Sequence, residues 1–262
     1  MTRYVGHGAI LALIAASNLW LVGCGKDHSK GLPSPSSRYA AVTKGFSAVV
    51  MVILPGGRSI CSGVIVSPRA VLTAAHCLTR QGRYQIDMDG KVFSTYTRVW
   101  KGQGTVESTD DIGLLLFSET IASGPEQIFE LGDSVREKDG LRLVGYGCEN
   151  IETREGSGLK RTGTGVVAFL DDYINFLTPQ DASSSRGIMG PDNLAGSCFG
   201  DSGGPALSER NGSYRVVGVT HAGGRYGKNY ISEYTDVTGR VGDNRSWLEQ
   251  MNHEHQLEIA GL

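Results

Sequence analysis

One serine of this 262-residue chain stands among glycines, a setting in which a hydroxyl can act as a nucleophile. The segment reads Gly200-Asp201-Ser202-Gly203-Gly204-Pro205. Glycines on both sides let the backbone turn sharply, which leaves the Ser202 hydroxyl exposed beside free backbone N–H groups. A serine hydroxyl is a weak nucleophile at neutral pH, so this chemistry requires a neighbouring base.

Two further segments offer that base and a carboxylate to orient it. His76 follows the small-residue run Leu72-Thr73-Ala74-Ala75, and an imidazole can take a proton from serine and later return it to a leaving group. Asp111 directly precedes the apolar stretch that begins at Ile112, and we expect its neighbour Asp110 to be solvated. Each motif also has a purely structural interpretation, as a glycine turn, a core histidine or a strand-end cap.

Short apolar segments must position these residues. They are rich in Val, Ile and Leu and are bounded by Gly, Pro, Ser or Asp, at residues 48–54, 62–66, 70–73, 112–117, 141–144, 165–170 and 216–220. This pattern predicts many short strands in an all-β barrel or sandwich. Near the end, Trp247, Leu248 and Met251 recur at helical spacing after Asp243-Asn244, which can cap a helix, so one terminal helix is expected.

The composition is that of a folded, loop-rich domain. The chain has 37 glycines, 40% hydrophobic residues and 20% charged residues, and its formal net charge is -2. This charge gives no bias towards nucleic acid, and we expect no nucleic-acid partner. The sequence has no Cys-x-x-Cys pair, and we expect His253-Glu254-His255 to be solvated, so we expect no metal and no cofactor.

The first 38 residues are expected to lie outside the folded domain. Arg3 precedes an apolar stretch at residues 9–22 that is too short for an ordinary membrane-spanning helix, which predicts an export signal over residues 1–23. Residues 25–37 are rich in Lys, Ser, Pro and Gly and predict a flexible tether within residues 24–38. We therefore place the folded domain at residues 39–262.

The end of the export signal, Leu21-Val22-Gly23-Cys24, resembles the lipobox of bacterial lipoproteins. The resemblance implies that Cys24 is lipidated and becomes the new N-terminus, which would attach the protein to a membrane. Gly25 stands where an aspartate would retain a lipoprotein at the inner membrane, which favours the outer membrane or cell surface. The alternative is an ordinary secretory signal in which Cys24 is incidental.

Taken together and in the order His76, Asp111, Ser202, the three motifs resemble the chymotrypsin family of trypsin-like serine peptidases. Subtilisin-like and α/β-hydrolase enzymes use the same residue types in other chain orders. The resemblance implies two perpendicular six-stranded antiparallel β-barrels with a C-terminal α-helix. It also implies protein or peptide substrates, with a protein inhibitor as a further conceivable partner.

The resemblance assigns a role to each matching residue of a serine endopeptidase that works through an acyl-enzyme. Ser202 would be the nucleophile, His76 the general base and acid, and Asp111 the carboxylate that orients the imidazole. The backbone N–H groups of Gly200 and Ser202 would form the oxyanion hole. The alternatives are a catalytically silent binding protein on the same fold, or an esterase with the same geometry.

If Cys24 carries lipid, four cysteines remain in an exported chain, so two disulfides are expected. The family resemblance implies that Cys61 pairs with Cys77 and braces the histidine loop. Cys198 stands where the family has a cysteine, but its usual partner is missing, which leaves Cys148 for it. Two free buried thiols are the alternative.

The family's primary specificity pocket falls on three small, uncharged residues, Gly196, Gly223 and Ser232. A buried substrate cation would have no partner there, which predicts cleavage after apolar residues. His221 and Ala222 stand where the family usually has Ser and Trp, so the neighbouring substrate-binding strand is unusual.

The resemblance also raises the question of zymogen activation. In the family a new N-terminal amine, made by a cut ahead of Ile-Val-Gly-Gly, pairs with the aspartate that here is Asp201. That sequence is absent, and a cut after Arg38 is the nearest equivalent. Otherwise another group must satisfy Asp201.

Overall fold

The computed structural model describes residues 41–148, 154–179, 195–227 and 229–262. The chain divides into two compact units, residues 1–31 and 32–262, and every described residue belongs to the second. The expected export signal, Cys24, the tether and Arg38 therefore lie outside the described residues. Among the described helices, none is long and apolar enough to cross a membrane.

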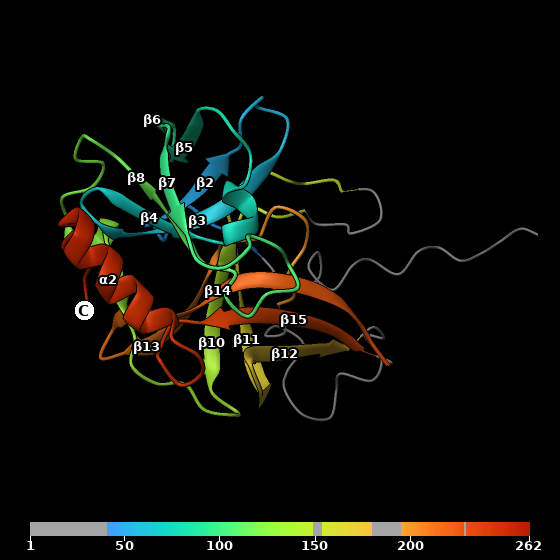
Figure 1. The fold of residues 1–262 in the computed structure, drawn as a ribbon. Helices are drawn as coiled ribbons and strands as arrows, with labels where there is room; N and C mark the ends of the chain where they lie inside the picture. Colours follow the sequence, from blue (N-terminus) through green and yellow to red (C-terminus); the bar gives the residue numbers. More distant parts are fainter. Residues whose placement is uncertain (1–40, 149–153, 180–194, 228) are drawn as a thin grey trace, which may run out of the picture. The chain divides into compact units, whose positions relative to one another are not determined.

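The first half of the domain is an antiparallel sheet of seven strands, two of which are the halves of one bent strand, so that six strands form a ring. Figure 1 shows this half in blue to green. The sheet order is β6-β5-β2-β3-β4-β8-β7. These strands are β2 (Val49–Ile53), β3 (Ile60–Ser67), β4 (Ala70–Thr73), β5 (Tyr84–Met88), β6 (Lys91–Thr95), β7 (Thr97–Trp100) and β8 (Gly113–Leu116). The edge strands β6 and β7 are separated in sequence only by the exposed Tyr96, so they are two halves of one strand that closes the ring.

The second half is also a six-stranded ring, closed by a pairing between β11 and β12. Its strands are β10 (Gly140–Gly145), β11 (Arg161–Leu170), β12 (Tyr173–Pro179), β13 (Pro205–Arg210), β14 (Ser213–Tyr226) and β15 (Asn229–Asp236). Two short strands join its rim, β1 (Ala41–Val42) on β11 and β9 (Glu130–Leu131) on β14. The expectation of two six-stranded barrels is confirmed.

The helices are few in the described part of the chain. Two are short 3-10 helices, η1 (Ala75–Leu78) and η2 (Pro125–Gln127), and the last is α2 (Asn244–His255). The predicted terminal helix is thus confirmed, although Asp243 at its N-cap makes no side-chain cap and instead pairs with Lys101. The helix ends at His255, and the next residue, Gln256, adopts the left-handed conformation common after a helix.

Three hydrophobic cores explain why some strands, such as β2, are continuously apolar, whereas others, such as β5, alternate. In β2, Val49 belongs to the core shared by the two barrels, whereas Val50 and Val52 belong to the core inside the first barrel. Alternate residues of a strand point to opposite faces, and here both faces are buried. The shared core also takes Leu248 and Met251 of α2, so the terminal helix helps to hold the barrels together.

Candidate active site

The side chains of His76 and Asp111 meet at the ends of two paired strands. β4 leads into η1, which carries His76, and β8 begins two residues after Asp111, with Thr73 opposite Gly113 in the β4–β8 register. One carboxylate oxygen of Asp111 accepts the backbone N–H of His76 at 2.8 Å. The other lies 2.7 Å from His76 Nδ1. The imidazole is therefore held by its ring and by its own backbone.

Asp111 is fully buried, yet it is held in its charged form. Burial alone would raise the pKa of Asp111, but hydrogen bonds from His221 and His76 outweigh it and hold the pKa below its ordinary value. Its neighbour Asp110 is 39% exposed and pairs with Lys101 at 2.7 Å. The structure thus brings His76 to Asp111 and leaves Asp110 at the surface.

A second imidazole reaches the same carboxylate. His221 Nδ1 lies 2.9 Å from Asp111 Oδ2, and the His221 side chain is buried. Its ring stacks on Tyr173, with 4.7 Å between ring centroids and 13° between planes. The sequence marked His221 as unusual but did not place it on Asp111.

Ser202 lies on the loop before β13, against the first barrel. Its carbonyl oxygen accepts the N–H of Ser62 in β3 at 2.8 Å and lies 3.8 Å from Sγ of Cys77, the residue after His76. The Ser202 side chain is partly exposed. Within the described ranges no hydrogen bond joins its hydroxyl to His76; such bonds are often long without substrate. The loop that carries Ser202 is thus placed against the turn that carries His76.

Ser62 fastens this loop to the first barrel, a role that sequence reasoning missed. Its hydroxyl donates to the carbonyl of Gly200 at 2.8 Å and accepts the N–H of Tyr146 at 2.9 Å. Ser62 is fully buried. A serine inside an apolar strand carries no local signal for such a contact, which joins segments more than 80 residues apart.

The glycines of the serine motif are required by close approach. A side chain on Gly203 would collide with Thr73 Oγ1 and the Ser62 carbonyl, and one on Gly204 would come 2.6 Å from the Val144 carbonyl. Gly200 has φ of +102°, a region that disfavours any residue with a Cβ. Among the described residues no acceptor takes the N–H of Gly200 or of Ser202.

Asp201 is held by the backbone instead of by imidazoles. Its two carboxylate oxygens accept the N–H of Gly147 at 2.7 Å and that of Cys198 at 2.8 Å. Burial raises the pKa of Asp201 to about 6, although these two N–H groups and the charge of Arg161 oppose the rise. A cavity of about 20 Å³, room for about one water molecule, adjoins this carboxylate and is also lined by Arg161 and Gly196.

The structure contains both expected disulfides. Cys61 and Cys77 have Cα atoms 6.4 Å apart and join β3 to the histidine turn. Cys148 and Cys198 have Cα atoms 5.4 Å apart and join the residue after Gly147 to the nucleophile loop. The described groups of potential metal ligands contain one cluster, Cys61, His76 and Cys77, in which both sulfurs are already bonded to each other.

Gly223 and Ser232, two of the three predicted pocket residues, face each other across β14 and β15. Ser232 accepts the N–H of Ser197, the residue after Gly196, at 2.9 Å, which brings the third close. A side chain on Gly223 would come 2.7 Å from the hydroxyl of Tyr230 and 2.8 Å from that of Ser197. Burial raises the pKa of Tyr230 to about 12, so this phenol is neutral at physiological pH. Neutral hydroxyls therefore surround the wall that Gly223 forms.

Comparison with known proteins gives the same fold and family. The chain is 26% identical over 231 residues to the clotting factor G beta subunit of Tachypleus tridentatus, covering 76% of this chain and 73% of that one. It is 25% identical to chymotrypsin-C of Bos taurus, covering 74% and 78%. A solved structure, the scabies mite inactivated protease paralogue S-D1, superposes with a TM-score of 0.63 at 14% identity, covering 85% of this chain and 99% of that one.

The family match spans most of the sequence and contains the whole constellation around Ser202. Residues 35–247 match the family described as Trypsin. Members of this family are serine endopeptidases that act on proteins and peptides, and the disulfides agree with an extracellular or secreted protein. The chain belongs to the trypsin family of chymotrypsin-like serine peptidases.

Proposed function

We propose that this protein is a serine endopeptidase in which Ser202 attacks the scissile carbonyl and His76 takes the serine proton. The observation that carries the proposal is the 2.7 Å contact between His76 Nδ1 and the buried carboxylate of Asp111. An ionised carboxylate has no proton to give, so Nδ1 carries the hydrogen and Nε2 is left as the base. His76 then returns the proton to the leaving amine, and water hydrolyses the acyl-enzyme.

The N–H groups of Gly200 and Ser202 would bind the oxyanion that forms when the carbonyl is attacked. Their support is the absence of any acceptor for them among the described residues, together with the rigid turn between them. Each such donor is worth about 10²–10³ in rate. Asp201, bonded to Gly147 and Cys198, holds this turn in place.

Covalent labelling tests the proposal most directly. An organophosphonate or sulfonyl fluoride should label the wild type at Ser202. Ser202→Ala should not be labelled, and its kcat should fall about 10⁶-fold. Ser208→Ala, a partly buried serine on β13, is the matched control and should label like wild type. An unlabelled wild type would favour a silent binding protein, and turnover of small esters without cleavage of casein would favour an esterase.

For the residue before the cleaved bond we propose an apolar, uncharged preference. Gly196, Gly223 and Ser232 carry no charge, and the hydroxyls nearby belong to Ser197 and the neutral Tyr230. A buried Arg or Lys would have no counter-charge among these groups. A peptide library that varies this position should show cleavage after apolar residues, and dominant cleavage after Arg or Lys would refute the assignment.

We propose that Asp201 is satisfied within the folded domain and does not need a new N-terminal amine. The support is its bonds to Gly147 and Cys198 and the nearby charge of Arg161, itself buried and bonded to the Gly147 carbonyl at 3.0 Å. Protein that is active with residues before Arg38 still attached, as read by N-terminal sequencing, would support this. Activity that appears only after a cut at Arg38 would make the protein a zymogen instead.

Attachment to the outer membrane or cell surface through a lipid on Cys24 remains our proposal from the lipobox-like sequence. Each buried methylene of a lipid chain contributes about 0.8 kcal/mol to membrane affinity, and several chains hold firmly. Detergent-phase partitioning and radiolabelled fatty-acid incorporation should both be lost in Cys24→Ser. A wild type that incorporates no fatty acid would leave an ordinary secreted protein.

A further inference from the structure

We infer that His221 is a second positioning residue for the reaction, holding Asp111 through the same carboxylate oxygen that orients His76. The inference rests on the proposed function, because it assigns a role within the same triad. His221 Nδ1 lies 2.9 Å from Asp111 Oδ2, and His76 Nδ1 lies 2.7 Å from that oxygen. Both side chains of the His221–Asp111 pair are almost completely buried.

The protons around Asp111 can be counted. The ionised carboxylate only accepts, so both imidazoles must carry hydrogen on Nδ1, and the two lone pairs of Oδ2 take both. Oδ1 is taken by the backbone N–H of His76 at 2.8 Å. The carboxylate thus has three donors in place of bulk water, and His221 is the one that does not belong to the histidine turn.

The backbone of β14 is shaped to aim His221. The register between β14 and β15 pairs Thr220 with Tyr234 and Ala222 with Glu233, so His221 is an extra residue at a β-bulge. Bulges occur beside active sites, where they redirect a side chain. Here the redirected side chain ends on the carboxylate of Asp111 in the other barrel.

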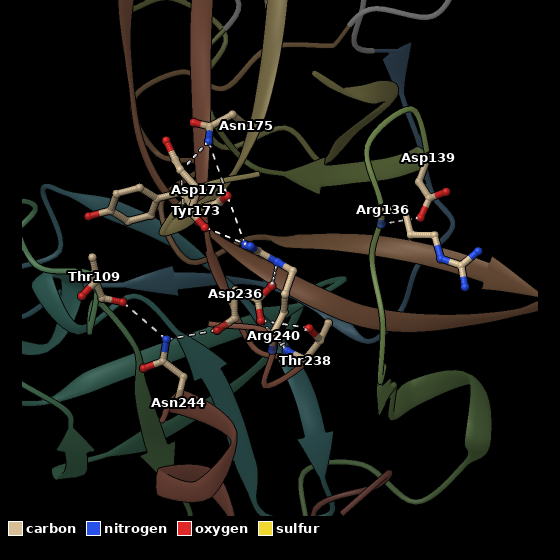
Figure 2. Close-up of polar contacts among 10 residues, drawn as sticks. All are labelled: Thr109, Arg136, Asp139, Asp171, Tyr173, Asn175, Asp236, Thr238, Arg240 and Asn244. Carbon is tan, nitrogen blue, oxygen red and sulfur yellow. Dashed lines mark hydrogen bonds and ion pairs between the residues drawn. The ribbon is translucent and has the colours of Figure 1, made fainter. Parts of the chain in front are cut away.

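The Tyr173 ring stacks on the His221 ring. A polar network holds Tyr173 in turn (Figure 2). The Arg240 guanidinium donates to the carbonyls of Asp171 at 2.9 Å and Tyr173 at 3.3 Å, and it pairs with buried Asp236 at 3.2 Å. The Tyr173 N–H in turn donates to the Asp171 side chain at 2.8 Å. The start of β12 is thereby fixed where its aromatic ring covers His221.

The same network reaches the strand end that carries Asp111. Asn244 at the start of α2 donates to the carbonyl of Asp236 at 3.1 Å and to that of Thr109 at 3.4 Å (Figure 2). Thr235 Oγ1 lies 3.5 Å from the Asp111 carbonyl. The residues that hold His221 and those that hold Asp111 are therefore tied together, so the contact between the two is maintained from both sides.

Two substitutions separate a hydrogen-bonding role from a packing role. His221→Phe keeps a ring against Tyr173 but has no donor, whereas His221→Ser keeps a donor but no ring. We expect His221→Phe to lower kcat by about 10–100-fold with KM little changed, because a buried carboxylate loses a charge-assisted hydrogen bond. His221→Ser should recover most of kcat. His253→Ala, an exposed histidine of α2, is the matched control.

Proton NMR tests the contact independently of turnover. The wild type should show two low-field imidazole N–H signals, and one should disappear in both His221 variants, with thermal melts confirming that they are folded. Wild-type kcat in His221→Phe, equal losses in both variants, or unchanged low-field signals would overturn the inference. A wild type that neither labels nor turns over would refute the proposed function instead, and the NMR result would still decide the His221 contact.

Discussion

Two buried aspartates of this molecule, Asp111 and Asp201, are held by different kinds of donor. Asp111 accepts from two imidazoles and one backbone N–H, and its pKa is lowered despite burial. Asp201 accepts from two backbone N–H groups, and burial raises its pKa to about 6. An imidazole donor can change its charge during a reaction, whereas a backbone N–H group cannot. The first carboxylate is suited to proton transfer and the second to holding a turn.

The largest effect should come from removing the charge at Asp111. Asp111→Asn should lower kcat by about 10⁴-fold with the fold intact, because the amide no longer selects the His76 tautomer that leaves Nε2 as the base. Asp110→Asn is the matched control and should stay near wild type, since the partly exposed Asp110 carboxylate pairs with Lys101, a lysine that also pairs with exposed Asp243. Steady-state kinetics with circular dichroism measure both, and equal losses in the two variants would contradict the assignment.

Removing the Cys148–Cys198 disulfide should affect the surroundings of Asp201 and spare Asp111. The bond joins Cys198, which donates to Asp201, to the residue after Gly147, the other donor. The double variant Cys148→Ser/Cys198→Ser should lose about 4 kcal/mol of unfolding free energy by the chain-entropy relation. Denaturant unfolding measures the loss, and the low-field N–H signals of Asp111's partners should persist. Their disappearance would show that the two regions are not independent.

A side chain at Gly147, beside Asp201, should lower the free energy of unfolding by less than loss of the disulfide does. A side chain on Gly147 would collide with the Asp201 carboxylate, which two backbone donors pin in place. Gly147→Ala should therefore lose about 1–3 kcal/mol of stability and part of kcat. Gly140→Ala, at the first residue of β10, would meet only Thr164 at 4.0 Å and serves as control. Equal melting temperatures for the two variants would mean that Asp201 is not held rigidly.

The smallest effect is a difference between Asp201 and Asp111 in how each makes the stability of the fold depend on pH. The raised pKa of Asp201 means that the folded state binds more protons than the unfolded state between about pH 4 and pH 6, so this residue makes stability fall as pH rises through that window. The lowered pKa of Asp111 acts oppositely, and its contribution is lost as acid protonates it. Melting temperatures from about pH 2 to pH 7 should therefore change slope in opposite directions, between about pH 4 and pH 6 in Asp201→Asn and below about pH 4 in Asp111→Asn. Slopes of the same sign would refute the contrast.

The sequence was sufficient for the fold because its signals are local. Strand-length apolar runs, the glycines around Ser202 and the helical spacing of Trp247, Leu248 and Met251 each reflect a conformation of neighbouring residues. The family resemblance added the pairing of distant parts, including His76 with Asp111. The bond from Ser62 to Gly200 and that from His221 to Asp111 could not be predicted, since each joins a strand of one barrel to a segment that belongs to the other. Only the unusual identity of residue 221 offered a signal.

Ser62 has a consequence for how this protein can vary. Its backbone and hydroxyl connect the first barrel to the Ser202 and Gly200 carbonyls of the second. Any slippage between the barrels is therefore transmitted to the turn at Gly200 to Ser202 through two hydrogen bonds, each of 2.8 Å. Substitutions deep in the interface, far from substrate, would then alter turnover while leaving specificity untouched, which makes the seam between the barrels a place where evolution or an engineer can adjust reaction speed.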